Sequence, residues 1–218
     1  MALIYTDVWE AIADRLPDHP AVVQGDRTVT WGDYDDRASR LAAAFSAAGI
    51  GHDRTVGMYL YNSPEYMETQ FAAFKVRATP INVNYRYLED ELWYLLDNAD
   101  CEAVVFHSSL GERLAHVADR LPDVKLWIEV PDDDSHWDDA VRYDDVLAEH
   151  EPAPRIERGY DDVYMLYTGG TTGMPKGVMY SMGDFTTFFL TAIATQAGLP
   201  PFERAESVAD VAAAMVGG

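Results

Sequence analysis

The sequence predicts an α/β fold in which a mostly parallel β-sheet is flanked by helices. Three short apolar runs, at residues 55–60, 103–106 and 126–130, have the length of buried strands. Segments with the 3.6-residue apolar period of a helix lie between them. Strands that alternate with helices along a chain form a parallel sheet, because each right-handed crossover brings the chain back in the same direction.

The N-terminal part is predicted to contain two helices and a hairpin. Thr6 can cap a helix over residues 7–15. A turn at Gly25 joins two short strands. Thr30 can cap a second helix, and Gly49 is a natural C-terminal stop for it. The apolar face of this second helix follows the helical period and comprises Tyr34, Ala38, Leu41, Phe45 and Ala48.

Further helices and strands follow in alternation. Ser63 before Pro64 predicts a helix start, with proline at the first helical position and the helix ending near residue 76. Residues 80–83 are apolar and extended, residues 110–120 are expected to be helical, and residues 163–167 form a new strand. A helical stripe comprises Leu88, Leu92, Leu95, Leu96 and Ala99.

An acidic loop and a proline-containing connector interrupt this pattern. Residues 132–139 are acidic and polar but lack the Gly and Glu positions of an EF-hand, so we expect a solvated loop. Residues 152–154, Pro-Ala-Pro, indicate a stiff connector. We therefore expect one domain over residues 1–218, with an α/β sheet portion at 1–151 and, after the connector, a strand pair with a following helix at 155–218.

Composition restricts the class of protein. Hydrophobic residues make up 48% of 218 residues, which is enough for a sizeable core and argues against disorder. A formal charge of −21 argues against nucleic-acid and anionic-membrane partners. No apolar run reaches the ~20 residues of a membrane-spanning helix, and no secretory signal is evident, so a cytoplasmic location is expected. Cys101, the single cysteine, cannot form an intramolecular disulfide and is interpreted as a structural thiol.

One segment indicates chemistry. It begins directly after the predicted strand at 163–167 and reads Tyr167-Thr168-Gly169-Gly170-Thr171-Thr172-Gly173-Met174-Pro175-Lys176-Gly177. Glycines allow several backbone N–H groups to converge on one anion. Threonine hydroxyls add donors or ligate a cation, and lysine adds a full positive charge. The segment therefore predicts a loop that binds a triphosphate.

Two common phosphate-binding loops do not fit this segment. In the Walker pattern, Pro175 would occupy the second glycine position and Gly177 the Ser/Thr position. The dinucleotide pattern fails because Gly169 and Gly170 are adjacent. Residues 178–180 indicate a second strand, and the next helix starts only at Ser181. We therefore expect a strand–loop–strand unit in which loop donors, not a helix dipole, bind the anion.

The segment resembles the signature phosphate loop of the adenylate-forming superfamily, which includes acyl-CoA synthetases, luciferases and peptide-synthetase adenylation domains. The usual form is Tyr-Thr-Ser-Gly-Thr-Thr-Gly, one variable residue, then Pro-Lys-Gly. Gly169 stands where the family usually has Ser, which removes one hydroxyl but keeps the N–H. The stretch at residues 80–87, followed by Glu91 and Leu92, resembles members that act on fatty acids and steroid side chains, and the helix start at residues 30–34 is also similar to the family.

The resemblance implies a site and a reaction. The positions that would contact the β- and γ-phosphates of ATP are Thr168, Gly169 through its N–H, Gly170, Thr171, Thr172, Gly173 and Lys176. Thr168 also matches a magnesium ligand, and Lys176 is the candidate catalytic residue. The implied reaction joins a fatty or steroid-side-chain carboxylic acid to ATP as an acyl-adenylate and then to coenzyme A.

Later family motifs, which contact adenine and ribose, are not found between residues 180 and 218. We therefore expect an N-terminal fragment that is inactive in isolation, and apolar residues 185–193 would leave it prone to form homo-oligomers. The segment at residues 31–33, Trp-Gly-Asp, is similar to the ribose motif only superficially and is interpreted as a helix start. An alternative is a non-catalytic nucleotide-binding or interaction module that retains the loop. An unrelated α/β protein with a Gly/Thr turn is a third alternative.

Some residues stay open between two roles. Asn82, Asn84 and Arg86 could satisfy backbone groups at a strand end or contact a substrate or partner. The large aromatic residues are expected in the core, including Trp9, Trp31, Trp93, Trp127, Phe188 and Phe189. The six histidines show no metal-binding spacing: His19, His52, His107, His116, His136 and His150.

Overall fold

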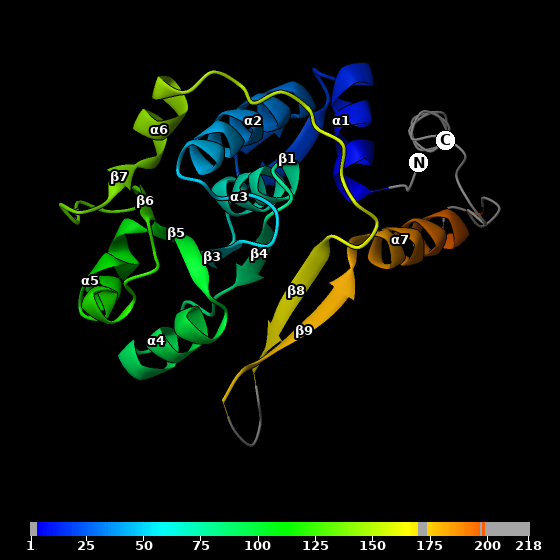
Figure 1. Ribbon diagram of the computed structural model, residues 1–218. Coiled ribbons are helices and arrows are strands. Elements are labelled where there is room, and N and C mark those ends of the chain that lie inside the picture. The colour runs from blue at the N-terminus through cyan, green and yellow to red at the C-terminus, as the bar shows by residue number, and fades with distance from the viewer. Residues whose placement is uncertain (1–3, 170–173, 197, 199–218) are drawn as a thin grey trace.

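Figure 1 shows the computed structural model of the chain, which describes residues 4–169, 174–196 and 198. The α-helices are α1 (Tyr5–Arg15), α2 (Trp31–Ala47), α3 (Pro64–Lys75), α4 (Glu89–Asn98), α5 (Gly111–Ala115), α6 (Tyr143–Glu149) and α7 (Met182–Gln196). The strands are β1 (Pro20–Gln24), β2 (Arg27–Thr30), β3 (Thr55–Tyr59), β4 (Thr79–Asn82), β5 (Cys101–His107), β6 (Leu126–Val130), β7 (Val141–Arg142), β8 (Val163–Thr168) and β9 (Lys176–Ser181).

A parallel sheet forms the centre of the molecule. Within the described residues it has five strands in the order β4-β3-β5-β6-β7, and every neighbouring pair is parallel. The three runs predicted as strands of one sheet lie in β3, β5 and β6, so the predicted α/β class is confirmed. Two antiparallel hairpins, β1-β2 and β8-β9, accompany the sheet.

Helices cover both faces of this sheet, as Figure 1 shows for α2 and α3 on one side and α4 and α5 on the other. Every residue of β5 is buried, which is the pattern of a strand covered on two faces. Because successive side chains of a strand point to opposite faces, Ala103 and Val105 pack in the core that contains α2, α3 and α6. Val104 and Phe106 pack in the core that contains α4 and α5.

Several local signals in the sequence specify the ends of elements. The Thr30 hydroxyl accepts a hydrogen bond from the Asp33 N–H at 3.1 Å, and the Ser63 hydroxyl accepts one from Tyr66 at 3.3 Å. Gly25 in the β1-β2 turn and Gly49 after α2 have φ angles of 58° and 76°, a region that favours glycine. These predicted caps and turns are confirmed.

The predicted start of α1 is wrong. The helix begins at Tyr5, so Thr6 lies inside it and is buried. The Tyr5 N–H, one of the N–H groups of the first turn that has no partner within the helix, donates to the Thr186 hydroxyl of α7 at 3.0 Å. A side chain 181 residues away in sequence therefore replaces the local cap.

Two other segments differ from expectation. Residues 110–120 are not one helix, because a 3-10 turn, the short α5 and a second 3-10 turn share this range. The leucine and valine side chains of this range, and the leucine directly after it, are still buried, so packing rather than helical propensity determines the segment: Leu110, Leu114, Val117 and Leu121. Helix α6 was not predicted, although its buried residues Tyr143, Val146 and Leu147 have helical spacing.

The segment that leads to β8 is attached to the helices by charged groups. The Ala153 N–H donates to the Ser39 carbonyl at 3.0 Å. Arg158 forms hydrogen bonds with Glu10 of α1, and Lys75 of α3 contacts the same carboxylate. In the described part of the chain, no helix is both long and apolar enough to cross a membrane.

Candidate functional site

The predicted phosphate-binding segment lies at the turn of the β8-β9 hairpin. The two strands are antiparallel, and the last pair before the loop is Thr168 with Lys176. The predicted strand–loop–strand unit is therefore confirmed. Four of the predicted site residues lie outside the described residues: Gly170, Thr171, Thr172 and Gly173.

The described residues at the two ends of the loop are accessible. Thr168, Gly169 and Lys176 are all exposed, so a ligand can reach them. The Thr168 hydroxyl is 3.5 Å from the Lys176 carbonyl oxygen, which is a long and weak hydrogen bond. No atom lies within 4 Å of a Cβ built on Gly169, so this residue borders open space. The hairpin thus presents one hydroxyl, one backbone N–H and one ammonium group at the mouth of the loop.

Tyr167, directly before the loop, is held by side chains of the parallel sheet region. The Asn82 amide donates to the Tyr167 carbonyl at 3.0 Å, and its oxygen accepts from the Tyr167 N–H at 2.8 Å. The Tyr167 hydroxyl donates to Asn98 at 2.9 Å. Burial raises the pKa of the Tyr167 phenol to about 12, so it stays protonated and can donate this bond. Of the two roles left open for Asn82, the structure supports the backbone one.

Asn84, two residues after the end of β4, also bonds a backbone group. The Asn84 side-chain oxygen accepts a hydrogen bond from the Arg86 N–H at 3.0 Å. The Arg86 guanidinium lies 5.5 Å from the ring centroid of Tyr85. Asn84 therefore shapes the turn after β4 and, unlike Asn82, makes this contact at the exposed surface.

Gly177 allows the two strands of the hairpin to approach. A Cβ at this position would lie 2.9 Å from the Met165 sulfur and 3.1 Å from Cε2 of Tyr167. Carbon contacts this short are repulsive, so the Tyr167 ring would have to shift. Packing within the hairpin therefore favours glycine at the position after Lys176.

We expect Gly177→Ala to lower the free energy of unfolding by about 1–2 kcal/mol, because the new methyl group displaces the Tyr167 ring. Thermal or urea denaturation of the chain measures this change. Gly169→Ala is the matched control, because its Cβ meets nothing within 4 Å. Equal stability of the Gly177 and Gly169 variants would contradict the steric argument.

The helix after β9 does not point its N-terminus into the loop. The Ser181 hydroxyl accepts from the Asp184 N–H at 3.1 Å and so caps α7, as the sequence predicted. Since β9 lies between the loop and α7, the helix starts at the far end of the strand. Anion binding at this hairpin would therefore use loop donors and Lys176.

Two features interpreted as structural are confirmed in that role. Cys101 is buried and reduced, and burial raises the pKa of its thiol far above the ordinary value, so it is no thiolate nucleophile. Asp33 lies in the first turn of α2, where its carboxylate accepts from the Thr30 hydroxyl at 2.9 Å. The Gly32 N–H donates to the Pro17 carbonyl at 2.9 Å.

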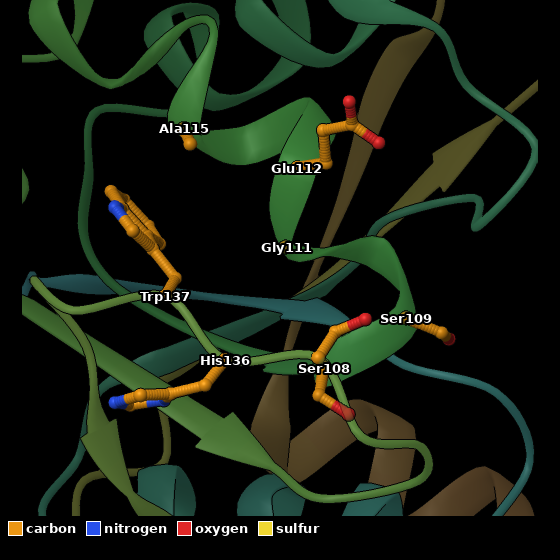
Figure 2. A pocket seen from close by; sticks show the side chains of 8 residues that line it. Ser108, Ser109, Gly111, Glu112, Ala115, His136 and Trp137 are labelled. Atoms are coloured by element: carbon orange, nitrogen blue, oxygen red, sulfur yellow. The ribbon is translucent and has the colours of Figure 1, made fainter.

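A separate pocket lies beside the carboxyl ends of β5 and β6, and Figure 2 shows its lining side chains. Its volume is about 270 Å³. The lining residues are Ser108, Ser109, Gly111, Glu112, Ala115, Ser135, His136 and Trp137. None of them belongs to the predicted site, and the lining contains neither Lys nor Arg, so this pocket does not have the charge of a triphosphate site.

Part of the acidic loop is ordered by contacts next to this pocket. Asp132 accepts hydrogen bonds from the Ser108 hydroxyl at 2.8 Å and from the Ser109 hydroxyl at 2.7 Å. The buried Glu129 carboxylate accepts from the Trp137 N–H at 2.8 Å and contacts His136 at 3.0 Å. The contacts of Ser108 and Ser109 with Asp132 could not be predicted, because they join the ends of two different strands, β5 and β6. The Glu129 contacts join β6 to the loop that follows it.

Comparison with known proteins identifies the family. The AMP-binding enzyme family matches residues 9–215. A medium-chain acyl-CoA ligase of Mycobacterium avium is 37% identical, over 84% of this chain and 36% of that protein. A 3-oxocholest-4-en-26-oate–CoA ligase of Rhodococcus rhodochrous is 39% identical, over 84% of this chain and 34% of that protein. The chain thus spans about a third of the length of the curated relatives it matches.

Solved structures share the fold. An anthranilate–CoA ligase in complex with anthranoyl-AMP superposes with a TM-score of 0.80 at 18% identity, over 87% of this chain and 36% of that one. A long-chain-fatty-acid–CoA ligase of Archaeoglobus fulgidus gives 0.76 at 23% identity, over 91% and 40%. The resemblance seen in the loop is confirmed by the family match and by relatives that align through this hairpin: the chain belongs to the AMP-binding enzyme family.

Proposed function

We propose that this chain supplies the phosphate-binding loop of an enzyme that activates a carboxylic acid with ATP and transfers the acyl group to coenzyme A. The observation that supports it best is the β8-β9 hairpin, which presents Thr168, the Gly169 N–H and Lys176 at one exposed end. The family membership and the names of the two relatives support the reaction class. Gly170, Thr171, Thr172 and Gly173 complete the proposed loop in sequence.

The proposed reaction has two steps. A carboxylate oxygen of the acid attacks the α-phosphorus of ATP, the bond from that phosphorus to the β-phosphate oxygen breaks, and pyrophosphate leaves. The thiol of coenzyme A then attacks the acyl carbon, and AMP leaves. In the first step the loop contacts the β- and γ-phosphates, so its donors and Lys176 act on the leaving group.

Magnesium is part of this proposal. The Thr168 hydroxyl fits the ion, because it is an exposed oxygen whose only described hydrogen bond, at 3.5 Å, is weak. Thr168 would therefore supply one ligand, and the ATP phosphates would supply others. When bound, the ion neutralises part of the triphosphate charge. Thr168 itself would fix where that charge lies relative to Lys176.

The proposed acid is a fatty acid or a steroid side-chain acid. The two relatives are named as ligases for medium-chain acyl groups and for 3-oxocholest-4-en-26-oate, and both align with most of this chain. The proposed setting is the cytoplasm, where ATP and coenzyme A are the co-substrates. The alternative, a nucleotide-binding module without catalysis, keeps the same loop but predicts no turnover.

ATP–pyrophosphate exchange tests the proposal directly. The protein that contains this chain is assayed with ATP, Mg²⁺ and either a medium-chain fatty acid or 3-oxocholest-4-en-26-oate. Acid-dependent exchange followed by acyl-CoA formation is the expected result, whereas residues 1–218 alone should show no exchange above background. ATP binding without exchange would favour the non-catalytic module, and no binding of ATP would contradict the proposed phosphate-binding loop.

We also expect residues 1–218 to self-associate through an apolar surface on β9 and α7. Phe188 and Phe189, expected in the core, are instead 70% and 38% exposed, and Met179 is 67% exposed. Exposed apolar surface of this kind favours association. Light scattering should detect oligomers whose proportion rises with concentration.

A charge substitution checks which surface is responsible. Phe188→Glu should reduce the oligomer, because it places a carboxylate in the apolar surface. Val23→Glu is the control, since Val23 is 64% exposed but lies on β1. A monodisperse monomer at high concentration, or equal effects of both substitutions, would contradict this expectation.

A further inference from the structure

The contact between Asn82 and Tyr167 joins two parts of the chain that are 85 residues apart. Asn82 is the last residue of β4, at the edge of the five-stranded sheet, and Tyr167 is the residue before Thr168 in β8. One side-chain amide satisfies both backbone groups of Tyr167, at 2.8 and 3.0 Å. A primary amide is required for this pairing, because it has a donor and an acceptor side by side.

The two hydrogen bonds replace a strand neighbour. In the described sheets β8 is laddered with β9 alone, and the hairpin shares no ladder with β4. In an antiparallel strand, the N–H and C=O of one residue point to the same side. Since both groups of Tyr167 point to Asn82, Tyr167 and its partner Gly177 form a non-hydrogen-bonded pair, in which side chains come closest. This geometry agrees with the tight space around Gly177.

The contact lies at the point where the loop begins. Asn82 orients the peptide groups on both sides of the Tyr167 α-carbon, and the second of them is the amide of Thr168. The ring of Tyr167 is fixed separately by its hydroxyl bond to Asn98 and by burial in the core with α4. The residue that enters the loop is therefore held in three places, while Thr168 itself is exposed.

We infer that Asn82 is a positioning residue for the phosphate-binding loop. It fixes the direction in which the Thr168 hydroxyl and the Gly169 N–H leave the sheet, and it does so without contacting nucleotide. The inference rests on the proposed function, in which this loop contacts the leaving pyrophosphate. Small displacements of groups that align reacting atoms reduce rates strongly, on the order of a hundredfold for about 1 Å.

Substitutions at Asn82 test the inference in the enzyme. Asn82→Ala removes both hydrogen bonds and should lower kcat of ATP–pyrophosphate exchange on the order of tenfold to a hundredfold at temperatures well below unfolding. Asn82→Asp keeps the acceptor but loses the donor and places a carboxylate beside the Tyr167 carbonyl, so it should be no better. Asn82→Gln retains both groups and should recover part of the rate. Asn84→Ala, which removes only the exposed turn contact, is the matched control and should leave kcat unchanged.

Hydrogen exchange on the chain provides a readout that needs no activity. In Asn82→Ala the amides of Tyr167 and Thr168 should exchange faster than in the wild type, while Asn84→Ala leaves them unchanged. If the wild-type enzyme shows no acid-dependent ATP–pyrophosphate exchange, the proposed function fails. Faster hydrogen exchange at both amides in Asn82→Ala would still support the positioning of the loop. Unchanged hydrogen exchange at these amides in Asn82→Ala would overturn the inference. So would a full kcat in a folded Asn82→Ala enzyme, because Asn82 would then serve only to join the hairpin to the sheet.

Discussion

Under the proposed function, Lys176→Ala is expected to slow acyl-adenylate formation on the order of tenfold to a thousandfold, with a smaller effect on ATP binding. Lys176 begins β9, is exposed, and is paired across the hairpin with Thr168. The sequence has two other lysines, and both contact carboxylates: Lys75 with Glu10 at 2.8 Å and Lys125 with Glu102 at 2.6 Å. In the part of the chain that the structure describes, Lys176 has no ion pair, so its charge is available to a ligand.

The expected effect on the rate exceeds the effect on ATP affinity because negative charge builds up on the pyrophosphate only as the reaction proceeds. In the ground state the triphosphate is already partly neutralised, so one exposed ammonium group adds little affinity. In the transition state negative charge grows on the departing pyrophosphate, and a group placed beside it stabilises that state most. Removing such a group therefore lowers kcat more than it weakens substrate binding.

Single-turnover formation of acyl-adenylate and direct binding of ATP measure the two effects separately. Lys125→Ala is the matched control, because it removes a lysine whose side chain is 50% exposed and which is remote in sequence from the loop. An unchanged rate for Lys176→Ala would exclude the lysine from the mechanism. A loss confined to ATP affinity would make Lys176 a binding residue only.

The fold could be predicted where local chemistry determines it. Thr30, Ser63 and Gly49 mark element ends because the groups they satisfy lie within a few residues of them. The start of α1 could not be predicted, because the N–H of Tyr5, its first residue, donates to the hydroxyl of Thr186 on α7. No pattern near Tyr5 contains that information.

In the candidate site too, the loop could be predicted from local sequence, whereas the contact that supports it could not. The Gly/Thr/Lys composition after a strand predicts an anion loop, because those residue types have the required groups wherever the loop lies. The support beneath it could not be predicted, as Asn82 reaches Tyr167 from another strand. From the sequence, Asn82 could either bond backbone groups or contact a ligand. The two roles are distinguished only by the residue that its amide meets in space, which is Tyr167.

Glu10→Ala is expected to lower the free energy of unfolding by about 2–3 kcal/mol, because two buried cations lose their shared partner and each keeps one other carboxylate, Lys75 with Asp35 and Arg158 with Asp7. The Glu10 carboxylate contacts Lys75 Nζ at 2.8 Å and Arg158 Nη2 at 2.8 Å. The exposed fractions of these three side chains are 5%, 4% and 2%. Glu10 lies on α1, Lys75 on α3 and Arg158 in the segment before β8, so the substitution also loosens the attachment of the hairpin.

The effect should depend on pH in a defined direction. Burial alone would raise the pKa of Glu10, but the hydrogen bonds and charges of Arg158 and Lys75 outweigh it and lower the pKa below the ordinary value. A carboxyl whose folded pKa is lowered stabilises the fold above its unfolded pKa, and this contribution is lost as the pH falls through the folded pKa. Asp7, on the other side of Arg158, has a pKa raised mainly by burial and also by the charge of Glu10, and it acts in the opposite sense.

Urea denaturation of wild type and Glu10→Ala at neutral pH, and at steps into the acid range below the ordinary carboxyl pKa, measures both features. The difference in free energy should be largest at neutral pH and should shrink on acidification, because protonated Glu10 no longer neutralises the two cations. Asp14→Ala is the matched control: Asp14 is also on α1 and pairs with Arg155 at 2.7 Å, but its side chain is 59% exposed, so its loss should cost about 1 kcal/mol or less. Equal losses for the two variants, or a Glu10 effect that grows on acidification, would show that burial of the paired charges does not determine the stability of this region.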